Sequence, residues 1–374
     1  MLGLYLHLPF CPYACAYCDF AVLVGQDRLI PEYLDLLEAE IGRHARRYGK
    51  RLVATIHFGG GTPSHIPASG IARLLDTISS HFALSSSPEI ALEANPDSVT
   101  SAKVRAWRDA GVNRVTIGWQ ALAQQGLDAL GRPAAAEDGA RALESLLEGG
   151  IESCGIDLIF GRPGQTLASW IEELEALPLD RIRHLSCYAL ELDSRTRLVR
   201  MIERGHRPSP DEDLCAAMYE VAVRRLADAG FARYEVSNFA LPGYRSRHNL
   251  RYWQDEEYLG VGMSAASYLE GERWTNPRGY RAYARIARGE GAPVLREPFD
   301  RDRRAGEALV FGLRLETGVD LAQIERRYGK ESLVRRESAI ARAVDAGALI
   351  REGSRMRLPP GGFFTEQEVL ADLL

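Results

Sequence analysis

The chain has 374 residues, more than a single hydrophobic core usually serves, so we expect one large and one smaller domain. Its formal charge of −5 predicts no polybasic surface, and nucleic acid is therefore not an expected partner. With 6 cysteines in so long a chain and no secretory leader, the sequence is not typical of a disulfide scaffold, and we expect a cytoplasmic protein. No apolar run approaches the roughly 20 residues that a membrane-spanning helix needs.

The first two thirds of the chain alternate between short apolar runs and helical patterns. Six runs predict strands, at 3–10, 52–58, 89–94, 114–120, 155–160 and 184–192. The segments between them predict helices, at 31–49, 67–82, 100–110, 122–130, 136–149 and 167–176. Strands that alternate with helices are typical of parallel βα units, and successive right-handed crossovers curl into a partial (β/α)6 barrel of the TIM type. In such folds the chemistry lies at the C-terminal ends of the strands.

The first expected strand leads into "CPYACAYC", in which Cys11, Cys15 and Cys18 are spaced by four and three residues. An odd number of thiols cannot all pair, so clustered thiols in a reducing compartment indicate metal or redox chemistry. A structural zinc site needs a fourth ligand, which would be His7, but His7 lies within the alternating pattern of the strand. A 4Fe–4S cluster held by three thiolates keeps one iron open for a small molecule, and we favour this interpretation.

Further candidate residues follow the later strands. The glycines of "FGGGTPS" (58–64) bring backbone N–H groups close to a ligand, or simply form a tight turn. Glu93 follows the third strand, either as a surface charge or as an acceptor for ribose hydroxyls or an ammonium group. Gln120 ends the fourth strand, and Arg132 comes after it. Asp157 lies inside the apolar fifth strand, where a carboxylate is costly unless it is paired, and a structural ion pair is the alternative to a functional role.

Beyond residue 300 the pattern changes. Residues 303–329 predict two helices, 331–349 a third, and 349–358 a hairpin with its turn at "EGS". This order resembles a winged helix, but residues 301–358 carry 13 Lys/Arg and 9 Asp/Glu, a mixture that favours packing or partner docking over DNA binding. We therefore expect a barrel at 1–235, a connecting region at 236–300 and a smaller winged-helix-like α+β domain at 301–374.

Eight motifs follow one another along the chain. They are "LYLHLPFCPYACAYCDF", "HFGGGTPS", "EANPDS", "GVNRVTIGWQ", "LGR", "IDLIFGRPGQT", "LSCYALELDSRT" and "YEVSNFALPGYRSRHNLRYWQDEEYLGVG". In this order they resemble the radical S-adenosylmethionine (SAM) superfamily and, within it, the oxygen-independent coproporphyrinogen III oxidase-like family, most closely its heme-chaperone branch. The resemblance extends from about Leu4 to near residue 330.

The resemblance implies roles for the candidate residues. Cys11, Cys15 and Cys18 would hold a 4Fe–4S cluster whose open iron chelates SAM through its amine and carboxylate. The residues implied to bind SAM are Tyr5, Gly60, Gly61, Thr62 and Glu93. A shell that holds a second SAM in the oxidases corresponds by position to Tyr17, Gln120, Arg132, Asp157 and Ala189. The family also implies an electron donor such as flavodoxin or ferredoxin, and we expect a monomer or weak dimer.

Two features separate a chaperone from an oxidase. The oxidases carry a further cysteine two residues after the third, where this chain has Phe20, and an N-terminal extension, where only three residues precede Leu4. Both differences favour a chaperone that delivers heme to acceptor proteins. The alternatives are an active coproporphyrinogen III dehydrogenase or another tetrapyrrole-modifying radical enzyme, and a binding protein whose SAM is never cleaved.

The segment "HNLRYW" (248–253) has the HNxxYW form of the chaperone branch, which makes His248 the candidate axial ligand for heme iron. The alternative is a histidine that only hydrogen-bonds its own surroundings. Ala134 in "LGRPA" and Ala266 in "GVGMSAAS" stand where many relatives have histidine, which removes two candidate ligands or proton donors. We expect heme as cargo and leave its iron ligands open.

Overall fold

The structure, a computed structural model, describes residues 1–291, 295–297, 299–362 and 370–374. Its centre is a 12-stranded sheet in the order β14-β13-β12-β11-β1-β4-β5-β6-β7-β8-β10-β9, counted over the described residues. The parallel neighbours in the middle are β1 (Leu2–Leu8), β4 (Leu52–Gly60), β5 (Ala83–Ala94), β6 (Arg114–Gln120), β7 (Ser153–Phe160) and β8 (His184–Ala189). These are the six strands expected from the sequence, and the α/β fold with a partial barrel is confirmed.

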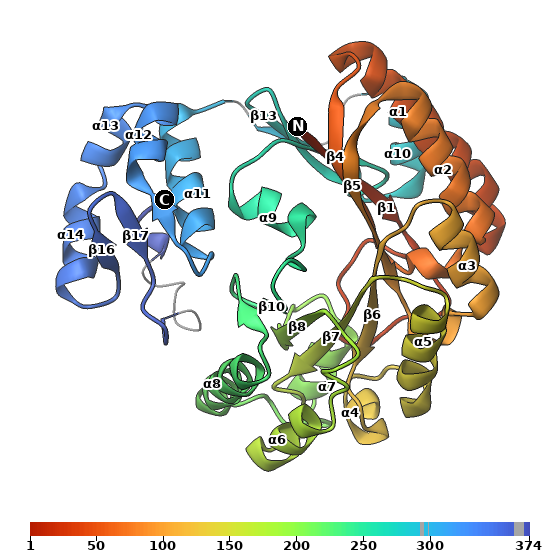
Figure 1. Cartoon of the computed structure of the whole chain (residues 1–374), viewed down its shortest axis with the longest axis horizontal. Coiled ribbons are helices and arrows are strands. Elements are labelled where there is room, and N and C mark those ends of the chain that lie inside the picture. Colours follow the sequence, from red (N-terminus) through yellow and green to blue (C-terminus); the bar gives the residue numbers. More distant parts are fainter. Residues whose placement is uncertain (292–294, 298, 363–369) are drawn as a thin grey trace.

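Helices connect the parallel strands and cover the outer face of the sheet (Figure 1). They are α1 (Ile30–Tyr48), α2 (Ala68–His81), α3 (Ser101–Asp109), α4 (Gln124–Ala129), α5 (Ala136–Glu148) and α6 (Leu167–Glu175), followed by α7 (Arg197–Glu203) and α8 (Glu212–Asp228) after β8. Local chemistry sets their ends: Pro31 lies in the first turn of α1, and the Asp211 carboxylate accepts the backbone N–H of Leu214 at the start of α8. No helix among the described residues has the length and apolar character needed to cross a membrane.

Side chains alternate along each strand and give the sheet two different faces. In β1 the leucines at positions 2, 4, 6 and 8 are buried, whereas Tyr5 and His7 fall on the opposite face. In β4, His57 lies between the buried Ile56 and Phe58. The outer face is therefore apolar and packs on helices, while the inner face carries polar groups and can form a site.

Strands beyond the expected six extend both edges of the sheet. On one side β11 (Tyr258–Val261) pairs parallel with β1, and β12 (Ala266–Leu269), β13 (Glu272–Thr275) and β14 (Leu295–Glu297) continue antiparallel. On the other side β10 (Asn238–Ala240) pairs antiparallel with β8, and β9 (Ala232–Arg233) pairs with β10. Because β1 and β8 take these neighbours, they do not meet, and the barrel stays open. The region 236–300, expected only to connect, also supplies α9 (Arg247–Trp253) and α10 (Tyr280–Ala287).

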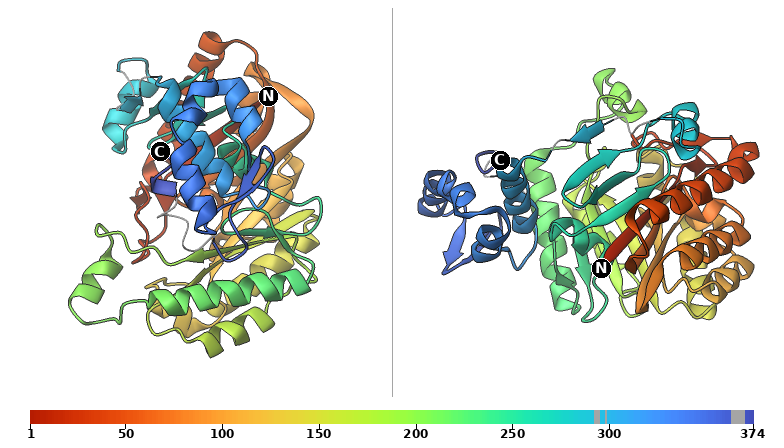
Figure 2. Two further views of the ribbon diagram at one scale, coloured as in Figure 1. Left: turned by 90° about the vertical axis from the view of Figure 1, so that its left-hand side faces the viewer. Right: turned by 90° about the horizontal axis from the view of Figure 1, so that it is seen from above.

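The chain from Arg301 forms a smaller module to one side of the sheet (Figure 2). Its elements are α11 (Arg301–Leu313), α12 (Leu321–Tyr328), α13 (Lys330–Val334), α14 (Glu337–Asp345), β15 (Val319–Asp320), β16 (Ile350–Glu352) and β17 (Arg355–Arg357). The hairpin expected at 349–358 is confirmed, with Gly353 at φ 63° in its turn.

The third helix expected at 331–349 is wrong as a single element, because the chain turns between α13 and α14. At that turn the Arg336 side chain donates to the backbone carbonyls of Leu373 and Leu374, at 2.7 and 2.9 Å. These contacts come from the far end of the chain and leave no local pattern. Of the ranges expected for the last two regions, residues 292–294, 298 and 363–369 lie outside the described part.

Candidate functional site

The three clustered cysteines lie in a loop that backbone hydrogen bonds close. Cys11 ends β2 (Phe10–Cys11), which pairs with β3 (Leu23–Val24), and the Cys18 N–H donates to the Cys15 carbonyl at 3.4 Å. All three are free thiols, with Cys11 buried and the other two half-buried. Burial raises the pKa of Cys11 to about 11, so a bare thiolate would be unfavourable there. A bound metal centre deprotonates its thiol ligands and removes this obstacle.

The donor set of the loop is three thiols, which could hold three irons of an iron–sulfur cubane. Among residues 1–291 and the other described ranges, no three His, Cys, Asp or Glu side chains are grouped to hold one metal ion. A cubane takes one thiolate per iron, so its cysteines surround a cluster and do not converge on one atom. His7 is engaged elsewhere: its Nε2 lies 3.0 Å from the Ala21 carbonyl oxygen and its Nδ1 3.1 Å from the Tyr5 hydroxyl. The zinc alternative thereby loses its expected fourth ligand.

Two side chains donate hydrogen bonds to the cysteine sulfurs. Thr62 Oγ1 donates to Cys11 Sγ at 3.4 Å, and Arg132 Nη1 donates to Cys15 Sγ at 3.8 Å. Arg132 is only 4% exposed and also donates to the Tyr17 hydroxyl at 3.4 Å. Burial raises the pKa of Cys15 and outweighs the guanidinium next to it, which favours the thiolate form, so this thiolate, like that of Cys11, needs a metal centre to form.

The glycine run at the end of β4 packs against the start of the cysteine loop. The Gly61 N–H donates to the Leu8 carbonyl at 2.8 Å, and a Cβ on Gly61 would lie 3.0 Å from Cys11 Sγ. Gly60 has φ 112°, and a Cβ there would lie 2.6 Å from His7 Nδ1. Neither position has room for a side chain, so the glycines are required by this packing before any ligand is considered.

A carboxylate and a histidine face each other on the inner side of β4 and β5. Glu93 Oε1 lies 2.9 Å from His57 Nε2, and Glu93 Oε2 accepts the Gly60 N–H at 3.3 Å. The His57 ring stacks on Tyr5, with centroids 5.9 Å apart and planes at 19°. Sequence reasoning did not select His57, although the alternation in "TIHFGG" places it on the same face as Tyr5 and Glu93.

Three more of the expected site residues belong to the next strands. Gln120 has φ 69°, a left-handed conformation uncommon outside glycine, and Arg162 Nη1 donates to its carbonyl at 3.1 Å. Asp157 is half-buried. Burial raises its pKa to about 7, although a hydrogen bond with Ser186 acts in the opposite direction. It makes no ion pair with any other described residue, so the ion-pair alternative is not supported. Ala189 ends β8 at the same edge of the sheet.

His248 lies in α9, toward the opposite end of the inner face from the cysteine loop. It is 0% exposed, and its Nδ1 and Nε2 lie 2.8 Å from Thr55 Oγ1 and from the Tyr252 hydroxyl. Both ring nitrogens are therefore engaged, and in this arrangement neither is free to bind iron. The geometry favours the alternative, in which His248 holds α9 against β4.

Two hollows adjoin the end of α9, between the sheet and the C-terminal module. The larger measures about 610 Å³, and residues such as Met1, Arg251 and Ile324 line it. The smaller measures about 270 Å³ and is lined mainly by aromatic side chains, among them Tyr258. Trp253 lines both, so the last residue of the HNxxYW segment faces the hollows while the first is buried in the barrel.

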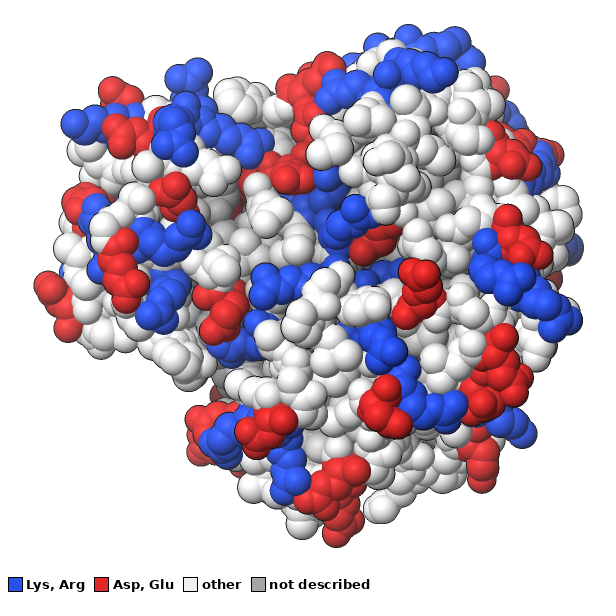
Figure 3. Space-filling model, in the orientation of Figure 1, with Lys and Arg blue, Asp and Glu red and all other residues white. Residues whose placement is uncertain are grey.

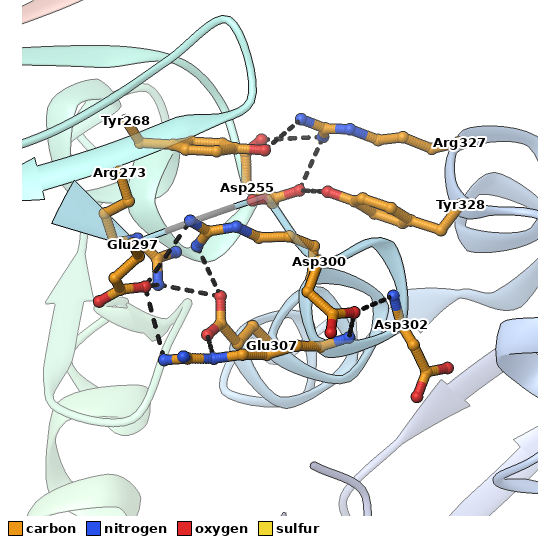
Figure 4. Close-up of polar contacts among 11 residues, drawn as sticks. Asp255, Tyr268, Arg273, Glu297, Asp300, Asp302, Glu307, Arg327 and Tyr328 are labelled. Carbon is orange, nitrogen blue, oxygen red and sulfur yellow. Dashed lines mark hydrogen bonds and ion pairs between the residues drawn. The ribbon is translucent and has the colours of Figure 1, made fainter.

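Polar contacts hold the module to the sheet beside these hollows (Figure 4). Asp255 accepts from the Tyr328 hydroxyl and lies 3.0 Å from Arg327 Nη1, while Arg327 Nη2 donates to the Tyr268 hydroxyl at 3.3 Å. Nearby, Arg273 and Arg304 both pair with Glu307. Such pairs neutralise much of the local charge, and acidic and basic side chains are interleaved over the face drawn in Figure 3.

Known proteins share both the sequence and the fold. Residues 5–177 match the Radical SAM superfamily and residues 299–365 the HemN C-terminal domain. The chain is 35% identical to the heme chaperone HemW of Mycobacterium tuberculosis, over 100% of this chain and 94% of that protein. It is 34% identical to the heme chaperone HemW of Bacillus subtilis, over 88% of each.

Among solved structures, coproporphyrinogen III oxidase (HemN) from Escherichia coli superimposes with a TM-score of 0.86 over 100% of this chain and 89% of that one. The sequences are 23% identical, so this match shows the shared fold alone. The two HemW proteins are more similar to the chain and align over most of their length. The chain therefore belongs to the HemW family of radical SAM proteins.

Proposed function

We propose that this protein is a heme chaperone, which binds heme and delivers it to acceptor proteins, and that it carries a SAM-ligated 4Fe–4S cluster. The observation that carries the proposal is the likeness to HemW proteins over the whole chain. An active coproporphyrinogen III dehydrogenase shares the fold, but Phe20 replaces the further cysteine expected in that branch.

The cluster is proposed to bind Cys11, Cys15 and Cys18. Thr62 and Arg132 donate to two of these sulfurs and so stabilise the thiolate form. SAM bound to a reduced cluster would accept one electron and supply a 5′-deoxyadenosyl radical with release of methionine, and that chemistry would belong to the cofactor. An electron donor such as flavodoxin or ferredoxin is the proposed source of the electron.

The proposed SAM site lies beside the cluster, on the inner face of β1, β4 and β5. Gly60 and Gly61 border this site, and Tyr5 lies there beside Gly59 and stacks on His57. Glu93 can accept a hydrogen bond from an ammonium or ribose hydroxyl, because its carboxylate is half-exposed and already fixed at two points. The remaining expected residues, Tyr17, Gln120, Arg132, Asp157 and Ala189, are proposed to line the adjoining inner surface.

For the heme cargo we propose the larger hollow beside Trp253. Its volume of about 610 Å³ is within the range of about 300–1,000 Å³ typical of small-molecule sites. Its lining combines apolar side chains such as Trp253 and Ile324 with charged ones of both signs. Arg251 and Arg327 are already paired with Glu256 and Asp255, so Arg355 is the lining arginine proposed to meet a heme propionate. The lining includes neither histidine nor cysteine, so the iron ligand is left unassigned.

We further propose a cytoplasmic protein with a barrel at 1–235, a connecting region at 236–300 and a winged-helix-like domain at 301–374, acting as a monomer or weak dimer. The six cysteines are all unpaired, which supports a reducing compartment. The paired charges around α11 and α12 support a docking role for the last domain over nucleic-acid binding.

Heme titration tests the proposed cargo site. Trp253→Ala should weaken heme binding about tenfold or more, because an aromatic anchor in a pocket carries much of the binding energy. Arg355→Ala, from the lining, should weaken it less, and Arg351→Ala on the neighbouring strand of the same hairpin should leave it unchanged. Wild-type protein that gives no Soret shift would refute the chaperone proposal, and a normal Trp253→Ala titration would refute this location.

A further inference from the structure

A column of aromatic rings runs along the inner face from α9 toward the cysteine loop. The Tyr252 hydroxyl bonds His248 Nε2, and the His248 ring stacks on His57, with centroids 5.1 Å apart and planes at 18°. His57 stacks in turn on Tyr5 at 5.9 Å, and the Tyr5 hydroxyl lies 3.1 Å from His7 Nδ1. The column therefore connects the HNxxYW segment to the residues that surround the glycine run.

His57 is the member of the column that bonds to Glu93 in the proposed SAM site. Its Nε2 lies 2.9 Å from Glu93 Oε1, and the other carboxylate oxygen accepts the Gly60 N–H. Its Nδ1 is buried and has no hydrogen-bond partner among the described residues. One hydrogen bond and two stacked neighbours, Tyr5 and His248, therefore fix the orientation of this ring.

His248 is the rigid neighbour of that ring. Its Nδ1 is 2.8 Å from Thr55 Oγ1, its Nε2 is 2.8 Å from the Tyr252 hydroxyl, and its backbone N–H donates to Glu89 Oε1 at 2.9 Å. Burial also lowers its pKa well below the ordinary value, so the ring stays neutral and adds no charge next to His57. A fully buried ring held at both nitrogens, on a backbone that is itself anchored to Glu89, can orient the ring that stacks on it.

We propose that His248 is a positioning residue for the SAM site. Its ring holds His57 so that Nε2 stays on Glu93, and Glu93 is thereby fixed next to Gly60, where the ligand is expected to bind. The inference rests on the proposed placement of SAM at Glu93 and Gly60. It gives the histidine of the HNxxYW segment a role in SAM binding, exerted through His57. Heme binding is then left to Trp253, the last residue of the segment.

The test measures SAM binding in heme-free protein with a reconstituted cluster. His248→Ala removes the stacked ring, and SAM affinity measured by calorimetry should fall about tenfold or more, as for other supporting residues of a metal site. The change that SAM causes in the paramagnetic resonance spectrum of the reduced cluster should then need correspondingly more SAM. His248→Phe keeps a ring against His57 while losing both hydrogen bonds, so it should restore most of the affinity at a lower thermal midpoint.

His184→Ala is the matched control. His184 is 3% exposed, and its Nε2 lies 2.8 Å from the Tyr234 hydroxyl, so this variant also loses a buried histidine–tyrosine hydrogen bond of the same sheet. Its ring contact is with Tyr234 and not with the column. We expect both alanine variants to lose thermal stability, and only His248→Ala to lose SAM affinity while heme affinity stays at the control level.

The outcomes separate this inference from the proposed function. If wild-type protein binds SAM and His248→Ala binds it equally well, or His184→Ala loses as much affinity, the positioning role is refuted. It is also refuted if His248→Phe binds SAM as weakly as His248→Ala, or if His248→Ala loses heme and keeps SAM. If the wild-type protein binds no SAM, the proposed cofactor site fails and the inference fails with it.

Discussion

The carboxyl group of Asp157, half-buried within β7, predicts a measurable dependence of stability on pH. Burial raises its pKa to about 7 from the ordinary 3.8, the hydrogen bond with Ser186 opposes the shift, and the charge of Glu93 adds to it. Because the folded-state pKa is above the unfolded value, the folded protein keeps a proton that the unfolded chain releases. The carboxyl group therefore destabilises the fold increasingly as the pH rises from 3.8 to about 7, and by a constant amount above that.

The magnitude follows from the size of the shift. A pKa of about 7 in place of 3.8 is a difference of about 3 units, which at 1.36 kcal/mol per unit costs up to about 4 kcal/mol at pH 8. Asp157→Asn has nearly the same shape and no ionisable proton, so it escapes this cost. Its advantage in the free energy of unfolding over wild type should grow by about 3 kcal/mol between pH 5 and pH 8.

The assay is denaturant unfolding of cluster-free protein, followed by circular dichroism at both pH values. Asp76→Asn, on the exposed face of α2, is the control and should change the free energy of unfolding equally at both. If the advantage of Asp157→Asn does not grow with pH, the carboxyl group is ionised in the fold and the reasoning about its burial is wrong.

Three further predictions concern the cluster, the glycines and the reaction. Replacing the three loop cysteines together by alanine should abolish the brown chromophore and the uptake of about four irons per chain, because each thiolate holds one iron of a cubane. Replacing the cysteines in β7, β8 and α8 should leave the chromophore and the iron uptake unchanged. Iron and sulfide analysis of both variants tests this. The two sets are Cys11, Cys15 and Cys18, and Cys154, Cys187 and Cys215. Gly60→Ala should lower the free energy of unfolding by about 1–3 kcal/mol more than Gly25→Ala, measured by thermal unfolding, and should also lower SAM affinity. Both glycines have positive φ, but only a Cβ on Gly60 would meet another residue, His7. Equal effects of the two substitutions would contradict this packing. Under anaerobic, reducing conditions with excess SAM, coproporphyrinogen III should yield no protoporphyrinogen by chromatography, because decarboxylation needs a substrate positioned to about 1 Å.

The six parallel strands could be predicted because each is an apolar run and helical patterns separate them. The edge strands β9 to β14 span only two to four residues each, too few for periodicity to stand out. Their pairing also depends on partners distant in sequence, as when β11 aligns with β1. The break between α13 and α14 was not predicted for the same reason, because Arg336 bonds to Leu373 and Leu374, which are distant in sequence.

The candidate site could be predicted where motifs lie at strand ends and less well inside the barrel. The pairing of β1 with β4 and the bond from His57 to Glu93 bring Tyr5, His57 and Glu93 onto one face, and His57, which lies inside its strand, was not predicted. The environment of His248 could not be read from the sequence, because Thr55, its partner at Nδ1, is 193 residues away. Burial and hydrogen bonding of both ring nitrogens favour the alternative stated for this candidate iron ligand, a histidine bonded to its own surroundings.

The measurement that tests the central claim most directly is heme transfer. Reconstituted protein loaded with heme is mixed anaerobically with a heme-free acceptor protein, the Soret band of the acceptor is followed, and a parallel sample receives coproporphyrinogen III. The account predicts that the acceptor gains heme from the loaded protein and that no protoporphyrinogen appears. An acceptor that gains no heme, together with turnover of coproporphyrinogen III, would contradict it.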